Sequence, residues 1–594
     1  MHTPLTERVS LLRDWLIQHD LDAIIIPHED EFLGEYIPAH NERLLWATDF
    51  TGSAGAAVIT RERAAIFVDG RYTVQVRKQT PETLFDYCHL IEEPPMTWAA
   101  NTLPAGSKIA VDIRMHNGAW WEAQCATHAD KLTLVAIDNN PIDTLWADRP
   151  AATLSDALLM PMESVGKSCA EKRTELAATL TAQDADAAVI TSLDSIAWLL
   201  NIRGTDIECL PVLLCHAILH ANGHLDFYID ATRLPAAFAD HVGQGVTVRA
   251  PAELKAGLIA LTGQHVLVDP ATANAWTKVT LVDAGATVVE QADPCLLPKA
   301  CKNSTELAGM QASHVRDGVA VSRFLAWIDR ELTAGQRPNE HQLAEKLWAL
   351  RQEDETCKEM SFHTISAAGG NAAMCHYRHD PSAPGELVED NVYLVDSGGQ
   401  YLDGTTDITR TVAIGNPSDE IKRTFTLVLK GHISLASARF PYGTTGNQLD
   451  TLARQHLWAQ GYEYDHGTGH GVGHYLNVHE GPGRISKVPN PIALQPGMVF
   501  SNEPGYYRAD AFGIRIENLE QVIEIPTEGD MTVLGFASLT RAPIDQRLID
   551  VSLMTSRELA WLNDYHQRVW DDVSPRLNEE DKAWLAQATS PLTR

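Results

Sequence analysis

A helix-then-strand pattern that occurs twice in the first half of the chain is the feature that most constrains its fold. Residues 11–16 place apolar side chains at helical spacing and lead into a short apolar run at 22–26. The pattern returns at 171–182, which reads as a helix, and at 186–190, which reads as a strand. Alternating helices and strands of this kind predict a layered α/β domain in each copy.

The two copies continue alike after this opening. Each first strand leads into a polar turn and a helix with a tryptophan, which is Trp46 in one copy and Trp198 in the other. Further strands are predicted at 56–60 and 64–68, and at 212–220 and 225–229. A connector at 142–154 and a boundary near 298–303 give two N-terminal α/β domains, residues 1–150 and 151–303.

The second half of the chain has a different character. A long periodic segment at 304–332 predicts a helix, and short strands, glycines and turn pairs dominate from residue 392 to about 545. This turn chemistry predicts a curved antiparallel sheet, and residues 556 to about 587 return to helix. We therefore expect a third domain over 304–594, with a helical extension from about 550, and an α/β and α+β multidomain protein overall.

The charge balance excludes one class of partner. The 594 residues include 47 Lys and Arg against 78 Asp and Glu, which gives a formal net charge of −31. Sequence-independent binding of nucleic acid needs cations against phosphate, so we expect no nucleic-acid partner.

The same sequence predicts a cytoplasmic protein without a membrane partner. The first helix carries charges where a signal peptide would be apolar, and the most apolar run, at 210–219, is about half the length that spans a bilayer. Nine scattered cysteines without a CxxC pair favour free thiols in a reducing compartment.

Five residues of the last domain form a candidate metal-binding set: Asp396, Asp407, His470, Glu503 and Glu517. Four carboxylates and one imidazole make a hard, oxygen-rich ligand set that favours Mn²⁺, Co²⁺, Fe²⁺ or Zn²⁺ over a thiolate-type zinc site. Four converging acids would repel one another strongly, and a pair of divalent cations is the natural neutraliser.

Each residue also has a simpler interpretation. A single acid at a strand end is usually a turn former or a solvated edge, and a lone histidine usually belongs to a core or a surface. The spacing of His466 and His470 matches a helical zinc motif, but the glycines at 467, 469, 471 and 473 argue against a helix. No G-x-S-x-G elbow and no GxGxxG turn occurs, so only the joint pattern favours metals.

That joint pattern resembles the aminopeptidase P family, the Xaa-Pro aminopeptidases among the pita-bread metallopeptidases, in its long three-domain form. The resemblance extends over almost the whole chain. It is carried by EYIPAHNERLLWATDFTGSAGAAVIT, VDGRY, SLDSIAWLLNIRGTDI, LPKACKNSTELAGMQASHVRDGVAV, HYR, YLVDSGGQYLDGTTDITRTVAIG, HGTGHGVGHYLNVHEGP and NEPGYYRADAFGIRIENL. It implies two similar creatinase-like α/β domains followed by a pita-bread catalytic domain.

The resemblance also implies roles for the five candidate ligands. Asp396 would bind one metal, Asp407 and Glu517 would bridge two metals, and His470 and Glu503 would complete the second site. A water or hydroxide held between the metals would be the nucleophile, with Glu503 as general base. The metals would be two divalent ions per chain, with Mn²⁺ ahead of Co²⁺ and Zn²⁺.

Six further residues match positions that contact substrate in the family. His376 and His479 would act in catalysis, at the substrate carbonyl and at the residue after the scissile bond. The remaining candidates for substrate binding are His466, Tyr507 and Arg515 near the metals, and Arg71 of DGRY in the N-terminal domain.

The implied reaction is release of an N-terminal residue from peptides whose second residue is proline, by a cytoplasmic homodimer. A bond before proline is a tertiary amide without an N–H, so its site must recognise a rigid ring. Three alternatives stay open: a prolidase that cuts only Xaa-Pro dipeptides, metal-free creatinase-like chemistry, and a catalytically silent binding module on the same fold. Departures from the family pattern include His379, where proline often follows HYR, Gly399, and the middle-domain stretch DIECLPVLLCHAILH.

Overall fold

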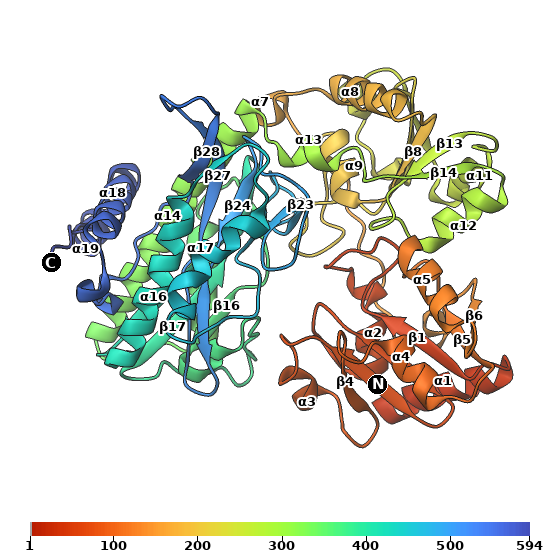
Figure 1. The fold of residues 1–594 in the computed structure, drawn as a ribbon, viewed down its shortest axis with the longest axis horizontal. Helices are drawn as coiled ribbons and strands as arrows, with labels where there is room; N and C mark the ends of the chain where they lie inside the picture. Colours follow the sequence, from red (N-terminus) through yellow and green to blue (C-terminus); the bar gives the residue numbers. More distant parts are fainter. Residues whose placement is uncertain (1–2) are drawn as a thin grey trace. The chain divides into compact units, whose positions relative to one another are not determined.

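Residues 3–594 are described by a computed structural model, shown as a ribbon in Figure 1. They fall into two units. The first consists of the residues up to Met160 together with Lys167–Cys295, and the second consists of Pro161–Gly166 and Leu296–Arg594. The short helix α7 (Met162–Val165) therefore belongs to the second unit, where the Val165 carbonyl accepts a hydrogen bond from Asn303 Nδ2 at 2.8 Å.

The first unit contains two six-stranded sheets with the same pairing pattern. In each sheet three central strands are antiparallel neighbours, and the outer strands on both sides add in parallel. This arrangement confirms the duplication predicted from the sequence. In spatial order the strands are β4 (Asp86–His89), β3 (Ala64–Val68), β2 (Ala56–Thr60), β1 (Ala23–Pro27), β5 (Ser107–Val111) and β6 (Leu132–Ala136), and then β12 (Val246–Arg249), β11 (Leu225–Tyr228), β10 (His216–His220), β8 (Ala187–Ile190), β13 (His265–Val268) and β14 (Thr287–Glu290).

Strand β1 is buried on both faces, which explains its uninterrupted apolar sequence. Successive side chains of a strand point to opposite faces, so Ile24 and Ile26 enter one core while Ala23 and Ile25 enter another. The helices that cover the sheets are α1 (Leu5–Gln18), α2 (Arg43–Thr48), α3 (Gln75–Gln79), α4 (Pro95–Thr102), α5 (Gly118–His128), α6 (Pro141–Leu145), α8 (Cys169–Ala182), α9 (Leu193–Leu199), α10 (Phe238–Val242), α11 (Leu254–Ile259) and α12 (Ala275–Asp283).

One predicted strand is shorter than expected. The sequence predicts a strand over 212–220, but β10 begins at His216. The preceding backbone turns toward Asp206 instead: the Leu214 N–H donates to Asp206 Oδ2 at 2.7 Å, and the Asp206 N–H donates to the Val212 carbonyl at 3.3 Å. The Asp206 carboxylate thus accepts the hydrogen bond that a neighbouring strand would otherwise accept.

The second unit is built on antiparallel sheets, as predicted for residues 392–545. Its strands form one six-stranded sheet, two three-stranded sheets and one two-stranded sheet. The strands are β21 (Arg439–Pro441), β28 (Val533–Ser538), β27 (Asn518–Ile525), β24 (Val499–Asn502), β22 (Gly469–Gly471) and β23 (Glu480–Ile485); β16 (Ile365–Ala368), β17 (Asn391–Ser397) and β20 (Ile408–Ile414); β15 (Cys357–Met360), β18 (Gly399–Tyr401) and β19 (Gly404–Thr405); and β25 (Gly505–Arg508) and β26 (Phe512–Arg515).

Two long helices interrupt the stretch that the sequence analysis assigned mainly to strands. They are α16 (Asp419–Ala436) and α17 (Gly446–Trp458), which pack against each other beside the strands (Figure 1). Ile421, Phe425, Val428 and Leu429 are buried at the spacing of one helix face, so the helical period was present between the glycine-rich turns. The other helices are α13 (Leu296–Ala300), α14 (Ser304–Thr333), α15 (Glu340–Arg351), α18 (Ser556–Val573) and α19 (Glu579–Ala588).

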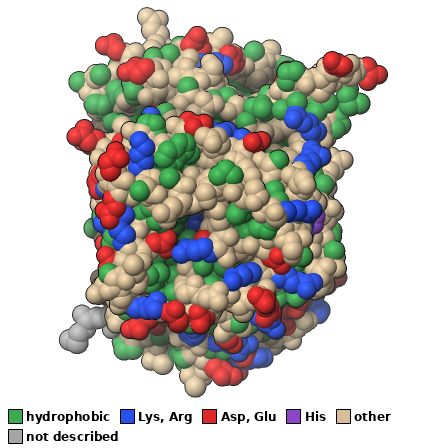
Figure 2. Space-filling model, turned by 90° about the vertical axis from the view of Figure 1, so that its left-hand side faces the viewer, with side chains coloured by type: hydrophobic (Ala, Val, Ile, Leu, Met, Phe, Trp, Pro, Cys, Tyr) green, Lys and Arg blue, Asp and Glu red, His purple; other side chains and the backbone are tan. Residues whose placement is uncertain are grey.

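The C-terminal helical region is two helices rather than one, because the turn Ser574–Arg576, with Pro575 inside it, separates α18 from α19. Among the described residues, no helix combines the length and the hydropathy needed to cross a membrane. On the face shown in Figure 2, acidic and basic side chains are interspersed with hydrophobic ones, so the negative charge is not gathered in one patch there.

Candidate metal centre

The ends of paired strands in the second unit bring the candidate acids together. Asp396 lies one residue before the end of β17, and the register of β17 against β20 places it opposite Thr409. Asp407 immediately precedes β20, so both aspartates lie at the same end of this strand pair. This strand pair therefore positions two acids that are eleven positions apart in the sequence.

His470 and Glu503 come from a different sheet. His470 lies in β22 and Glu503 directly follows β24, and the two strands pair through Gly471 and Phe500. His470 Nε2 lies 3.6 Å from Glu503 Oε1 and 3.5 Å from Asp407 Oδ2. The strand assignment confirms that the His466–His470 spacing does not reflect a helical zinc motif.

Glu517 reaches the same place from a break between strands. Strand β26 ends at Arg515 and β27 begins at Asn518, so Glu517 lies in the short link between the two strands. The Arg515 and Glu517 side chains, two positions apart, both meet Thr409. The Thr409 hydroxyl donates to Glu517 Oε2 at 2.8 Å and accepts from Arg515 Nε at 3.1 Å.

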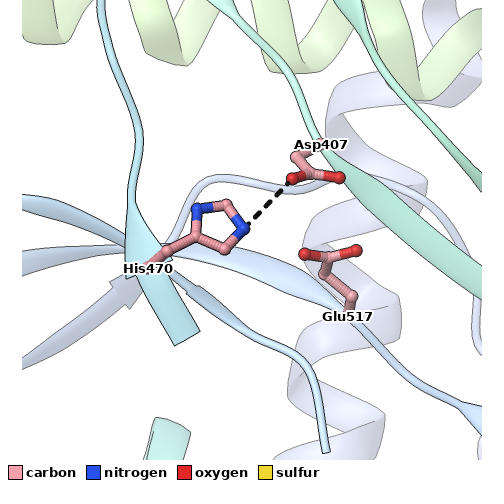
Figure 3. A group of neighbouring side chains, drawn as sticks. All are labelled: Asp407, His470 and Glu517. Atoms are coloured by element: carbon pink, nitrogen blue, oxygen red, sulfur yellow. Dashed lines mark ion pairs between the residues drawn. The ribbon is translucent and has the colours of Figure 1, made fainter. Parts of the chain in front are cut away.

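Asp407, His470 and Glu517 each offer a ligand atom, and these atoms all lie within 4.8 Å of one another (Figure 3). The Gly471 carbonyl lies 2.9 Å from His470 Nδ1, which therefore carries the ring hydrogen in the neutral tautomer. The lone pair of Nε2 then faces the carboxylates, which is the orientation that a metal-binding histidine needs.

The carboxylates of this cluster resist ionisation when no cation is present. Burial and the charges of the neighbouring acids raise the pKa of Asp407 and of Glu517 well above their ordinary values. Burial is also the main reason why the pKa of Glu503 is raised to about 7, although Arg515 opposes the shift. Asp396 Oδ2 is ion-paired to Arg515 Nη2 at 2.6 Å, whereas its buried Oδ1 accepts no hydrogen bond. This donor set fits divalent cations, which would compensate the repulsion and satisfy the orphaned oxygen.

One side of the cluster is a hydrogen-bonded wall of three predicted substrate-binding residues. Arg515 Nη1 donates to the Tyr507 hydroxyl at 2.6 Å, and that hydroxyl lies 2.8 Å from His466 Nε2. Burial lowers the pKa of His466 to about 3, so its ring is neutral at physiological pH. Since Nδ1 faces the Gly467 carbonyl at 2.7 Å, Nε2 accepts the hydrogen of Tyr507.

The remaining predicted residues lie at different places. The exposed His479 ring has its centroid 4.3 Å from that of His470, and His376 is near enough for its charge to contribute to the lowered pKa of His466. Arg71 lies in the first unit, where it forms an ion pair with Asp69 at 2.7 Å.

Arg410 is a residue at the site that the sequence analysis missed. Its guanidinium is buried, and it donates to the carbonyls of Glu517 at 2.6 Å and Pro543 at 2.9 Å, and to the Tyr565 hydroxyl at 2.9 Å. Burial lowers its pKa. Thr409 and Arg410 follow a candidate ligand in the motif DITRT, but nothing in one sequence separates them from other strand residues.

Family models match most of the chain. The creatinase/prolidase N-terminal domain matches residues 8–139 and again 148–306, metallopeptidase family M24 matches 308–524, and the C-terminal region of that peptidase family matches 532–592. These matches confirm the fold class predicted from the sequence, two related N-terminal domains followed by a pita-bread domain.

Relatives match over the full length. The chain is 39% identical to a probable Xaa-Pro aminopeptidase P of Laccaria bicolor, over 99% of this chain and 94% of that protein. It is 37% identical to aminopeptidase P1 of Arabidopsis thaliana, over 99% of this chain and all of that one. The X-prolyl aminopeptidase of Caenorhabditis elegans, a cytosolic enzyme with a di-nuclear active site, superposes with a TM-score of 0.95 at 33% identity, and each chain is covered completely. The chain therefore belongs to the Xaa-Pro aminopeptidase P family and is a metallopeptidase of family M24.

Proposed function

We propose that this enzyme hydrolyses the N-terminal Xaa-Pro bond of peptides with proline at position two. The observation that carries the proposal is the buried cluster of mutually repelling carboxylates around one imidazole whose Nε2 faces them. Relatives with this specificity in their names, matched over whole chains, support the same reaction.

Two divalent cations per chain fit this cluster. Asp396 would hold the first, His470 and Glu503 the second, and Asp407 and Glu517 would lie between them. Mn²⁺ is our first assignment, with Co²⁺ and Zn²⁺ as alternatives, because the ligands are mainly carboxylate oxygens. Such a pair of cations lowers the pKa of bound water and polarises the substrate carbonyl.

Glu503 is the proposed general base. Its carboxylate would accept a proton from the attacking water and return it to the leaving nitrogen of proline. Its Oε1 receives a hydrogen bond from the Ser501 hydroxyl at 3.3 Å, which helps to orient the carboxylate.

The other residues are assigned to the substrate. His376 and His479 would contact the scissile carbonyl and the residue that follows it, and the wall of His466, Tyr507 and Arg515 would bind the proline ring. The neutral His466 ring and the pairing of Arg515 with Asp396 leave this wall with little free charge, which suits an apolar ring. Arg71 is proposed to contact the peptide from the N-terminal domain.

A comparison of peptide lengths distinguishes this proposal from a prolidase. We expect Xaa-Pro-Yaa tripeptides to be cleaved at the first bond, with kcat/KM at least 100-fold above that for the dipeptide Xaa-Pro. Release of the N-terminal residue can be followed by chromatography with added Mn²⁺, Co²⁺ or Zn²⁺. Preferential hydrolysis of the dipeptide would identify a prolidase, and no hydrolysis with two bound metals would favour a silent binding module.

Replacement of His470 by alanine should lower metal content from about two ions per chain toward one, since it removes the nitrogen ligand that faces Asp407 and Glu503. Loss of a hydrogen-bond partner of a ligand typically weakens a metal site about 10- to 100-fold, and loss of the ligand itself should weaken the site at least as much. Elemental analysis after gel filtration measures the occupancy. His456→Ala is the matched control on α17, where the ring faces Ser434 rather than the cluster; equal metal content in all three proteins would contradict the assignment.

We further propose that the enzyme is a cytoplasmic homodimer with domains 1–150, 151–303 and 304–594. The cytosolic location of the C. elegans relative supports the compartment. Light scattering that gives the mass of a single 65.3 kDa chain would contradict the dimer.

A further inference from the structure

The loop between β16 and β17 carries His376, and one buried carboxylate holds it from both ends. This carboxylate belongs to Glu340, the first residue of α15, whose exposed fraction is 0%. No role in the site follows for Glu340 from its position in the sequence, since it lies 36 positions before His376.

The Glu340 carboxylate accepts four hydrogen bonds, two at each oxygen. The Ala368 N–H and Asn371 Nδ2 donate to Oε1 at 2.7 and 2.9 Å. The Tyr377 hydroxyl and the Gly385 N–H donate to Oε2 at 2.8 and 2.9 Å. The donors lie at the end of β16, in the loop on either side of His376, and at Gly385. One side chain therefore joins several separate points of the segment 368–385.

The surroundings of the Glu340 side chain suit an acceptor with a negative charge. All four donors are neutral, and the N-terminus of the twelve-residue helix α15 favours a carboxylate through its partial positive charge. Burial and the bond to Glu340 raise the pKa of Tyr377, so its hydroxyl remains a donor. A side chain at Gly385 would meet the carboxylate, since its Cβ would lie 2.7 Å from Glu340 Cδ.

The same contacts fix the backbone next to His376. The Tyr377 N–H donates to the Met374 carbonyl at 3.0 Å, which closes a turn with Cys375 and His376 at its centre. Asn371 Nδ2 also donates to the Tyr377 hydroxyl at 3.1 Å. The residues before and after this turn are therefore tied to each other and to Glu340.

Helix α15 makes one more contact with the loop. His341 Nδ1 lies 3.3 Å from His379 Nε2, at the position where the family often has proline after HYR. His379 thus holds the loop against α15 through a side-chain contact, where a proline would restrict the backbone through its ring.

We propose that Glu340 is a positioning residue for catalysis: it holds the loop so that the His376 imidazole is presented to the substrate carbonyl. This inference rests on the proposed function, in particular on the role of His376. An error of about 1 Å in the placement of a catalytic group can lower the rate about 100-fold, so a support outside the reacting atoms can have a large effect.

Glu340→Gln tests the proposal with almost unchanged side-chain volume. One carboxylate oxygen becomes an amide group that cannot accept the two hydrogen bonds it faces. We expect kcat on an Xaa-Pro-Yaa tripeptide to fall about 10- to 100-fold, KM to stay within about threefold, and metal content to stay unchanged. Hydrogen exchange of the amides in 369–385 should become faster. Tyr377→Phe removes one of the four donors and should show the same pattern with a smaller loss.

Two comparisons separate positioning from a general loss of stability. In a His376→Ala background, Glu340→Gln should lower kcat by less than about threefold, because the group that it positions is absent. Glu306→Gln is the matched control: this buried carboxylate receives the Asn303 N–H at 2.9 Å at the start of α14, away from the loop, and its loss should leave kcat and loop exchange unchanged.

Equal losses in both backgrounds, or unchanged exchange of the loop in Glu340→Gln, would overturn the proposal. A failure of the proposed function gives a different result, because the unaltered enzyme would then not cleave the tripeptide. The exchange measurement would still report whether Glu340 holds the loop.

Discussion

Replacing Glu503 by glutamine is expected to lower kcat by about 10²- to 10⁴-fold, the range that a positioned general base contributes. The amide keeps the size of the side chain but cannot accept a proton from water. It also keeps only one oxygen to act as a ligand, so occupancy of the second metal has to be measured in the same preparation. Kinetics on an Xaa-Pro-Yaa tripeptide, with excess metal present, isolates the loss of the base.

Glu520→Gln is the control for this substitution. Glu520 is also buried in the second unit, on β27, and burial raises its pKa to about 8, so it is largely protonated at pH 7. An amide resembles a protonated carboxyl in size and charge, and we expect activity within about twofold of the unaltered enzyme. Near-normal turnover of Glu503→Gln with full metal content would remove Glu503 as the base.

Removal of the metals by a chelator should abolish measurable activity and return it when a divalent cation is restored. The metal-free protein keeps four acids in one buried place, so its stability should depend on pH in a defined direction. The raised pKa of Glu503, about 7, lies above the value of about 4.3 expected in an unfolded chain. Between these values the folded state binds more protons than the unfolded state.

The free energy of unfolding of the chelated protein should therefore fall as the pH rises from about 4.3 to about 7. For Glu503 alone the change is on the order of 3 kcal/mol. The raised pKa values of Asp407 and Glu517 act in the same direction. Bound cations favour the ionised acids, so the stabilisation by metal should be larger at pH 8 than at pH 6.

Urea unfolding of the chelated and the metal-loaded protein at these two pH values measures the difference. A chelated Glu503→Gln variant supplies the comparison, since it lacks one of the titrating groups and should show a weaker pH dependence. If metal stabilised the protein equally at pH 6 and pH 8, the acids would not be coupled to the cations, and the assignment of the cluster as the metal centre would be wrong.

Local patterns in the sequence predict the repeated α/β architecture well. Strands β2 and β3 have the predicted bounds, because a short, fully buried strand is an uninterrupted apolar run. Helices α16 and α17 were missed because the glycines and turn pairs around them dominated the interpretation, although Ile421 and Phe425 show the helical period.

The sequence identifies the candidate ligands only as a joint pattern. It does not identify the residues that hold them in place, such as Thr409 and Arg410. Asp396 and Asp407 follow from strand ends, which are local features. The meeting of Arg515 and Glu517 at Thr409 depends on contacts across more than a hundred positions of the chain. Side-chain alternation can place residues two positions apart on one face, but it does not say which distant strand that face meets.

The buried guanidinium of Arg410 links the C-terminal part of the chain to the backbone of a proposed metal ligand. Its hydrogen-bond acceptors include Pro543 and Tyr565, which lie beyond the last strand, and it also holds the backbone of Glu517. A chain shortened before these residues would leave the buried Arg410 guanidinium without two of its hydrogen-bond acceptors, next to the proposed ligand Glu517. The end of the polypeptide, which contributes no ligand of its own, is thus inseparable from the reactive centre.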